Sequence, residues 1–205
     1  MSFLAYFIND GKCYLCEKEG DAICEKCFSK LDLIARSEIL PDFKLTSFYN
    51  YNEIASKILI MSKYPPYYFY LLKYLIRNTL LPKFKENSLF CPVPLSSLRM
   101  FERKFNQAEL IAQEFTKKQE LPVFSILKRV KETNALFELG KKERLQEMES
   151  AFKVSFFGKL LPKKESLSLI LVDDLVTTTS TASQCVKVLK NSGFKNVEVL
   201  SLFRA

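Results

Sequence analysis

The chain of 205 residues contains no histidine. That absence excludes a histidine general base, a Ser-His-Asp triad and any metal site with imidazole ligands. The chain also has no internal repeat, no low-complexity linker and no apolar run near the roughly 20 residues that span a bilayer. Its first ten residues lack the basic region and the small-residue cleavage site of a signal peptide. We therefore expect a cytoplasmic protein with one main domain and a small appendage.

Positive charge is distributed unevenly along the chain. The net charge at neutral pH is +8, with 31 Lys and Arg against 23 Asp and Glu. Residues 1–48 are net acidic, whereas residues 57–105 contain nine basic side chains against two acidic ones. A basic surface favours partners that carry phosphate, either nucleotides or nucleic acid. A solvated lysine-rich surface without such a partner has the same composition, so charge leaves both interpretations open.

The N-terminal region contains two C-x2-C pairs separated by seven residues, formed by Cys13, Cys16, Cys24 and Cys27. Each pair presents two thiolates to one ion, and two pairs complete a tetrahedral site. The spacing predicts a structural zinc ion, which would stabilise a segment too short to form its own core. A redox dithiol and an iron–sulfur cluster are the alternatives. Cys91 and Cys185 stand in apolar stretches and are expected to be buried thiols.

Hydrophobic patterns predict an alternation of strands and helices along the rest of the chain. Strands are expected at 45–51, 88–95, 167–172 and 196–203, and helices at 52–62, 67–80, 105–118 and 181–190. Pro65 and Pro66 separate the first two helices, and Gly193 caps the last one. Residues 129–150 are polar and only weakly periodic, which indicates a long excursion or a mobile loop with a short helix. The final strand, helix and strand form a βαβ unit and predict an α/β fold with a parallel sheet.

The stretch LILVDDLVTTTST, residues 169–181, joins an apolar strand to two carboxylates and then to a run of hydroxyls. Ligands of open α/β sheets lie beyond the carboxyl ends of the strands, where we expect Asp173 and Asp174. Carboxylate oxygens accept hydrogen bonds from ribose hydroxyls or bind a divalent cation. The next helix offers free N–H groups to a phosphate at its start. Hydroxyls add donors there, from Thr177, Thr178, Thr179, Ser180 and Thr181. The alternative is a buried strand followed by an ordinary hydroxyl-rich helix cap.

This stretch resembles the signature with which type I phosphoribosyltransferases bind phosphoribosyl pyrophosphate (PRPP): four apolar residues, two acidic ones, two variable ones and a Thr/Gly-rich loop. The resemblance implies that Asp173 and Asp174 contact ribose hydroxyls, that residues 177–181 hold the 5′-phosphate and that Mg²⁺ accompanies PRPP. The family usually has glycine where Thr179 stands. The resemblance also implies a pyrophosphate loop after an earlier strand, at Pro94, Leu95, Ser96 and Ser97.

A second resemblance covers most of the chain. Residues 91–108, CPVPLSSLRMFERKFNQA, resemble the ComF family of competence proteins, whose pattern is P-V-P-L, an Arg-rich turn and R-G-F-N-Q-A. Lys104 replaces the glycine of that pattern. The family's R-x-x-x-T…L…R…AF segment is matched by Arg129, Thr133, Leu136, Arg144, Ala151 and Phe152. The four-cysteine zinc finger, this middle block and the PRPP-type loop follow one another in the family's order.

The ComF resemblance implies a protein that handles incoming single-stranded DNA in the cytoplasm during natural transformation, near the inner-membrane channel and recombination proteins. We expect a four-cysteine zinc-binding subdomain over residues 1–45. A type I phosphoribosyltransferase-like PRPP-binding domain, with helices flanking a parallel sheet, is expected over residues 46–205. The acidic zinc subdomain fits docking on a channel, helicase or recombination protein better than binding to DNA. The basic candidates for phosphate or DNA contacts are Arg99, Arg103, Lys104, Arg129, Lys131 and Arg144.

The sequence leaves open whether the site catalyses phosphoribosyl transfer. That reaction needs Mg²⁺ and basic groups rather than histidine, but no segment indicates a pocket for an acceptor base. An enzyme of nucleotide metabolism or salvage would consume PRPP with its acceptor, whereas the DNA interpretation predicts salt-dependent binding of single strands. Aromatic and basic side chains in residues 63–77 suit stacking on DNA, although aromatic residues at helical spacing more often belong to the core.

Overall fold

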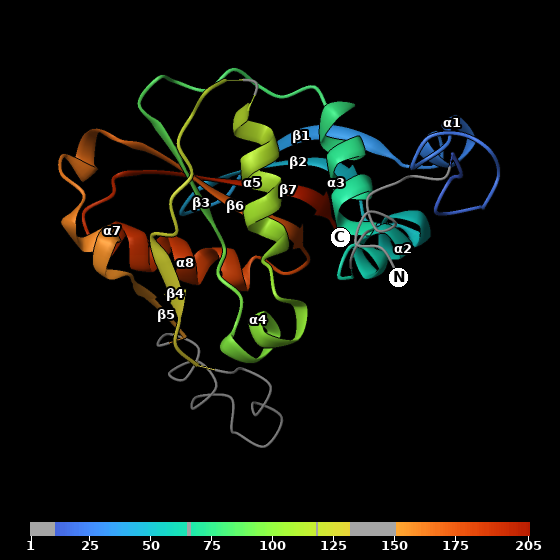
Figure 1. Cartoon of the computed structure of the whole chain (residues 1–205). Coiled ribbons are helices and arrows are strands. Elements are labelled where there is room, and N and C mark those ends of the chain that lie inside the picture. Colours follow the sequence, from blue (N-terminus) through green and yellow to red (C-terminus); the bar gives the residue numbers. More distant parts are fainter. Residues whose placement is uncertain (1–10, 65–66, 118, 132–150) are drawn as a thin grey trace.

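A computed structural model describes residues 11–64, 67–117, 119–131 and 151–205 of the chain (Figure 1). Its centre is a five-stranded sheet with the strand order β1-β2-β7-β6-β3. The strands of this sheet are β1 (Leu33–Ile39), β2 (Lys44–Asn50), β3 (Ser88–Pro92), β6 (Ser168–Val176) and β7 (Asn196–Arg204). A separate antiparallel ribbon consists of β4 (Leu127–Arg129) and β5 (Phe152–Val154).

The sheet is parallel except for one edge strand. β2, β7, β6 and β3 run in the same direction, and β1 pairs antiparallel with β2. Residues 168–172 of β6 are buried without interruption, as expected for a strand that helices cover on both faces. The predicted α/β class with a mostly parallel sheet is confirmed. β1 escaped prediction because most of its residues are exposed, so it shows no apolar run.

Helices cover both faces of the sheet. α2 (Glu53–Met61), α3 (Tyr67–Arg77) and α5 (Gln107–Lys117) share one buried cluster with Ile170 and Val172 of β6. α8 (Ser180–Asn191) and the β4–β5 ribbon share the other cluster with Leu169 and Leu171. Alternate residues of β6 therefore pack into the clusters on opposite faces of the sheet, because successive side chains of a strand point to opposite faces. The shorter helical elements are α1 (Glu25–Phe28), α4 (Ser97–Arg103), α7 (Phe156–Leu160) and the 3-10 turn Lys164–Ser166.

The N-terminal cysteine segment packs on α3. Tyr14 contacts Tyr67 and Tyr70, with ring centroids 5.1 and 5.7 Å apart, and Phe28 contacts Tyr74 at 5.8 Å. These aromatic side chains of α3 are thus used in packing between segments rather than offered to a ligand. The predicted division of the chain between residues 45 and 46 falls inside β2 and remains a prediction. Among the described residues, no helix is long and apolar enough to cross a bilayer.

Candidate functional site

The predicted site residues meet at the carboxyl ends of β3 and β6. β3 pairs with β6 as far as Pro92 opposite Val172, and the N–H of Val93 still donates to the carbonyl of Val172 at 2.8 Å. Pro94 has no N–H, so this ladder ends there. β6 continues beside β7 to Val176, which leaves its last residues without a partner on the β3 side. The predicted end of the strand at residue 172 is wrong, since both carboxylates lie inside β6.

A cavity of about 320 Å³ lies at this edge of the sheet. Predicted site residues from four separate segments line it: Pro94 and Leu95 after β3, Arg99 and Arg103 of α4, Arg129 of β4, and Asp173, Asp174, Thr177 and Thr181 around the end of β6. Carboxylates, hydroxyls and guanidinium groups thus face one space. This combination can bind a ligand that has both hydroxyl and phosphate groups.

The two carboxylates differ from ordinary surface acids. Oδ1 of Asp173 accepts from the N–H of Asp174 at 3.0 Å, and Oδ1 of Asp174 accepts from the N–H of Leu175 at 2.8 Å. Asp173 borders the cavity, yet desolvation and the adjacent charge of Asp174 raise its pKa well above the ordinary carboxyl value. The nearby charge of Arg129 opposes this rise. A cation or a set of hydroxyl donors in the cavity would relieve the repulsion between the two acids.

The hydroxyl-rich stretch is divided between the cavity and the start of α8. Thr177 and Thr181 line the cavity. The hydroxyls of Thr178 and Ser180 lie 3.2 Å apart and bond to each other. Thr179 occupies the N-cap position of α8 with φ −74°, a conformation that suits any residue, so the absence of glycine there causes no backbone strain.

The predicted basic residues fall into three groups. Arg99, Arg103 and Arg129 line the cavity, and Nη1 of Arg103 also donates to Oε1 of Gln107 at 2.8 Å. Lys104 borders a neighbouring hollow, and Lys131 is exposed outside the cavity. Arg144, with Thr133 and Leu136 of the same motif, lies outside the described residues.

The predicted pyrophosphate loop continues directly into α4, where the sequence suggested only an Arg-rich turn. Ser96 is the N-cap residue of α4, and its Oγ accepts from the N–H of Arg99 at 3.4 Å. Ser97 is the first residue of the helix. Pro94 and Leu95 line the cavity, whereas Ser96 and Ser97 do not. The role of the four residues with pyrophosphate remains a prediction.

The Asn-Gln pair of the family pattern holds the walls of the cavity together. Nδ2 of Asn106 donates to the carbonyl of Val93 at 2.9 Å, and its Oδ1 accepts from the N–H of Ala108. The buried Gln107 donates from Nε2 to Oγ of Ser62, at 2.6 Å, next to the end of α2. These bonds attach α5 to the strand on one side and to α2 on the other.

Sequence patterns missed one wall of the cavity, the one formed by the start and end of α2. Tyr51, Ser56 and Lys63 line it. The hydroxyl of Tyr51 donates to Oγ of Ser56 at 3.1 Å. Of these three residues, only Lys63 belongs to a stretch for which the sequence suggested a ligand, and the packing of α2 beside α5 brings the side chains to the site.

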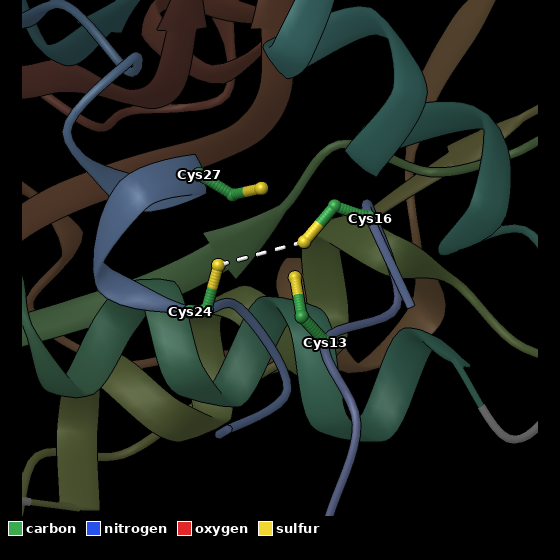
Figure 2. Close-up of side chains that lie close together, drawn as sticks. All are labelled: Cys13, Cys16, Cys24 and Cys27. Atoms are coloured by element: carbon green, nitrogen blue, oxygen red, sulfur yellow. Dashed lines mark hydrogen bonds between the residues drawn. The ribbon is translucent and has the colours of Figure 1, made fainter. Parts of the chain in front are cut away.

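The four N-terminal cysteines form one cluster (Figure 2). Their sulfur atoms all lie within 4.8 Å of one another, and those of Cys16 and Cys24 are 3.6 Å apart. In a tetrahedral site with Zn–S bonds of about 2.3 Å, sulfur atoms stand about 3.8 Å apart. All four cysteines are free thiols, so their donor chemistry and spacing fit a tetrahedral metal ion.

Backbone groups favour the thiolate form of one cysteine of the cluster, Cys13. The N–H of Leu15 points to the sulfur of Cys13 at 3.4 Å. Burial opposes ionisation of Cys13, but hydrogen bonds from the backbone of Cys24, Leu15 and Cys16 lower its pKa to about 7. Burial and the neighbouring thiols raise the pKa of Cys27 to about 12. Outside the cluster, Cys91 and Cys185 are fully buried, as predicted.

Three curated proteins are similar to this chain. Competence protein F of Haemophilus influenzae is 35% identical over 115 residues, which cover 56% of this chain and 49% of that protein. DNA utilization protein YhgH of Salmonella typhimurium is 32% identical over 113 residues, 55% of this chain and 47% of that protein. Competence protein ComFC of Streptococcus pneumoniae is 32% identical over 127 residues, 60% and 51% respectively. These similarities and the four-cysteine cluster support the resemblance to the ComF family that the sequence motifs indicate.

The chain spans about half the length of the curated relatives it matches. No protein-family model matches it. Among solved structures, it is similar to a glutamine PRPP amidotransferase from B. subtilis, with a TM-score of 0.37, 14% identity and coverage of 72% of this chain and 26% of that one. A structure of an allosteric regulatory enzyme of purine biosynthesis has a TM-score of 0.37, 15% identity and coverage of 79% and 28%. The fold class follows from the sheet, whose strands β2, β7, β6 and β3 are parallel.

Proposed function

We propose that this ComF-like protein binds PRPP with Mg²⁺ in the cavity at the end of β6 and handles single-stranded DNA during natural transformation. The observation that carries the proposal is the convergence of two carboxylates, two threonine hydroxyls and three arginines on one cavity. Ribose hydroxyls need acceptors, and phosphate groups need donors and positive charge. PRPP presents both kinds of group on one small molecule.

Each part of the ligand has matching groups in the cavity. Asp173 and Asp174 would accept from ribose hydroxyls. Thr177, Thr181 and the first N–H groups of α8 would donate to the 5′-phosphate. The pyrophosphate would lie toward Pro94–Ser97, where Arg99 and Arg103 supply positive charge. Mg²⁺, when bound with PRPP, neutralises part of the pyrophosphate charge.

Zinc is the ion that we propose for the cysteine cluster. Four thiolates form a closed shell without a position for water, which suits a structural site. The ion would hold the segment of residues 13–27 in the shape that packs on α3. We propose that the surface of this segment, which carries net negative charge, docks on a protein of the uptake or recombination machinery.

A role in competence is supported by the names of the relatives, two competence proteins and a DNA utilization protein. We propose a cytoplasmic site of action, peripheral to the inner membrane where DNA enters. The DNA-handling part of the proposal is supported by the net charge of +8 and by the basic region at residues 57–105.

The decisive experiment is a calorimetric titration with PRPP and Mg²⁺. The wild-type protein should bind PRPP, and the double variant Asp173→Asn with Asp174→Asn should lose that binding. Asp42→Asn, an exposed position remote from the cavity, is the matched control. Equal PRPP affinity of the wild-type protein and the double variant would refute the site. Release of pyrophosphate in the same sample, on addition of DNA or free bases, would reveal a transferase.

A further inference from the structure

A second hollow adjoins the PRPP cavity, and a third adjoins the second. The second hollow has a volume of about 640 Å³, and α4 forms its outer wall. It shares four lining residues with the PRPP cavity: Pro94, Leu95, Asn106 and Arg129. The third hollow, of about 580 Å³, shares Lys128 with the second and extends over β5 to α7. Lys128 and Arg129 are neighbours on β4, so this strand connects all three spaces. Figure 1 shows α4, the β4–β5 ribbon and α7 along the same side of the molecule. We call the surface from α4 to α7 the β4 face.

The β4 face exposes aromatic rings that contribute little to the core. Phe101 of α4 is 72% exposed, and Phe156 and Phe157 of α7 are 70% and 76% exposed. Phe101 lines the second hollow and Phe156 lines the third. A phenylalanine normally buries its ring, so three exposed rings, two of which line hollows, indicate a surface that a partner covers.

Positive side chains line the same two hollows. Nζ of Lys104 is 3.8 Å from the centroid of the Phe101 ring. Lys128, Lys153 and Lys159 are exposed and line the third hollow. Among the described residues that line the second and third hollows, Glu109 is the single acidic side chain. The β4 face therefore combines flat apolar surfaces with a row of cations.

We propose that the β4 face is the path of single-stranded DNA, with bases stacked on Phe101 and Phe156 and phosphates held by the lysines of the same hollows. This inference rests on the DNA-handling part of the proposed function and specifies where the strand lies. Proteins that bind single strands without sequence preference combine basic grooves with aromatic stacking platforms. An anionic membrane surface would instead favour one continuous apolar face on a longer amphipathic helix.

The path also ends beside the proposed sugar-phosphate site. Arg129 lines both the PRPP cavity and the second hollow, so a strand on the β4 face would reach the rim of that cavity. PRPP and the strand would then share this arginine. Bound PRPP should consequently change the affinity for DNA, and DNA should change the affinity for PRPP by the same factor.

The test is fluorescence anisotropy of the full chain with labelled dT20. Phe101→Ala with Phe156→Ala should weaken binding about tenfold or more, as expected for two lost stacking contacts. Lys128→Gln with Lys159→Gln should reduce the slope of log affinity against log salt by about 1.4. The matched controls are Leu80→Ala, an exposed apolar residue, and Lys83→Gln with Lys85→Gln, two exposed lysines of a cavity that shares no residue with the β4 face. Unchanged melting temperatures would show that the variants are folded.

The outcomes separate this path from the proposed function. Binding of dT20 that neither double variant weakens, or that the controls weaken equally, would overturn the path alone. Binding of dT20 through the β4 face without any binding of PRPP would sustain the path and overturn the sugar-phosphate site. No binding of dT20 by the wild-type protein would overturn both the path and the DNA-handling role, as would Phe156-dependent binding to phosphatidylserine vesicles in place of DNA.

Discussion

The two candidate sites of this protein are assembled in opposite ways. The cysteine cluster takes all of its donors from residues 13–27, a single short segment. The cavity at the end of β6 takes its lining from segments as distant as Tyr51 and Thr181. A metal ion can organise the first site on its own, because four thiolates at suitable spacing can close around one ion. The second site exists only when the sheet and its helices are in place. The following predictions test this contrast.

The largest effect is expected from loss of the metal. Replacing Cys13 and Cys27 by serine should abolish binding of one zinc equivalent and lower the free energy of unfolding by roughly 4 kcal/mol or more. Both side chains are buried in the same cluster as the core residues of α3, so the damage should reach the main domain. Metal content by plasma mass spectrometry and thermal melting measure the two effects. Ser29→Ala, at an exposed position two residues after this segment, should change neither quantity.

At Asp173 we expect one substitution to weaken ligand binding and to increase the stability of the unliganded protein. The Asp173→Asn variant should bind PRPP at least about 30-fold more weakly, because a charged hydrogen-bonding partner is lost. The unliganded variant should nevertheless be more stable than the wild-type protein at neutral pH. The folded state raises the pKa of Asp173, so the wild-type protein loses stability as pH rises above the unfolded value of about 3.9. Melting temperatures between pH 4 and pH 8 should diverge in favour of the variant as pH rises, and parallel curves would contradict this account.

At Glu38 we expect the opposite dependence on pH to that at Asp173, because the folded state lowers the pKa of Glu38. Its Oε1 accepts from Nε of Arg204 at 3.0 Å, and Nη1 of Arg204 donates to the carbonyls of Val176 and Thr177. The hydrogen bond and charge of Arg204 lower the pKa of Glu38. Glu38→Gln should therefore cost about 1 kcal/mol at neutral pH, an effect that vanishes as acid protonates the wild-type carboxyl. Denaturant titrations at pH 7 and at pH 3 measure the difference, and an equal cost at both would exclude the ion pair as its cause.

The smallest effect concerns the position at which the family pattern has glycine. Lys104 has φ 65° at the C-cap of α4, a left-handed conformation that glycine adopts without steric cost. Lys104→Gly should raise the free energy of unfolding by about 0.5–1 kcal/mol. The same change removes the cation over Phe101 and should weaken dT20 binding. Lys104→Ala loses the cation without the gain in stability, so the two variants should differ in urea midpoint but not in DNA affinity.

Local patterns predicted the units of the fold well and their ends less well. The helices α2, α3, α5 and α8 lie within a few residues of their predicted bounds, because apolar spacing, prolines and caps act locally. Gly193 has φ +104° after α8, as a predicted helix cap should. The strand β6 was predicted too short, since two carboxylates give no apolar signal while the pairing with β7 continues past them. α4 was missed because it has no buried face, so its sequence lacks the usual period.

The sequence by itself determined the cysteine cluster, the α/β class and the acidic and hydroxyl groups of the cavity, because spacing along the chain fixes each of these. Only the tertiary structure decided which basic groups stand beside them. Arg99, Arg103 and Arg129 line the cavity while Lys131 does not, and nothing in their local sequence separates them. The β4 face was equally hidden, since Phe101 and Phe156 are 55 positions apart in the chain. The packing of the whole chain decides which side chains stay exposed and which distant segments lie close together. The sequence of a single segment therefore cannot predict either property.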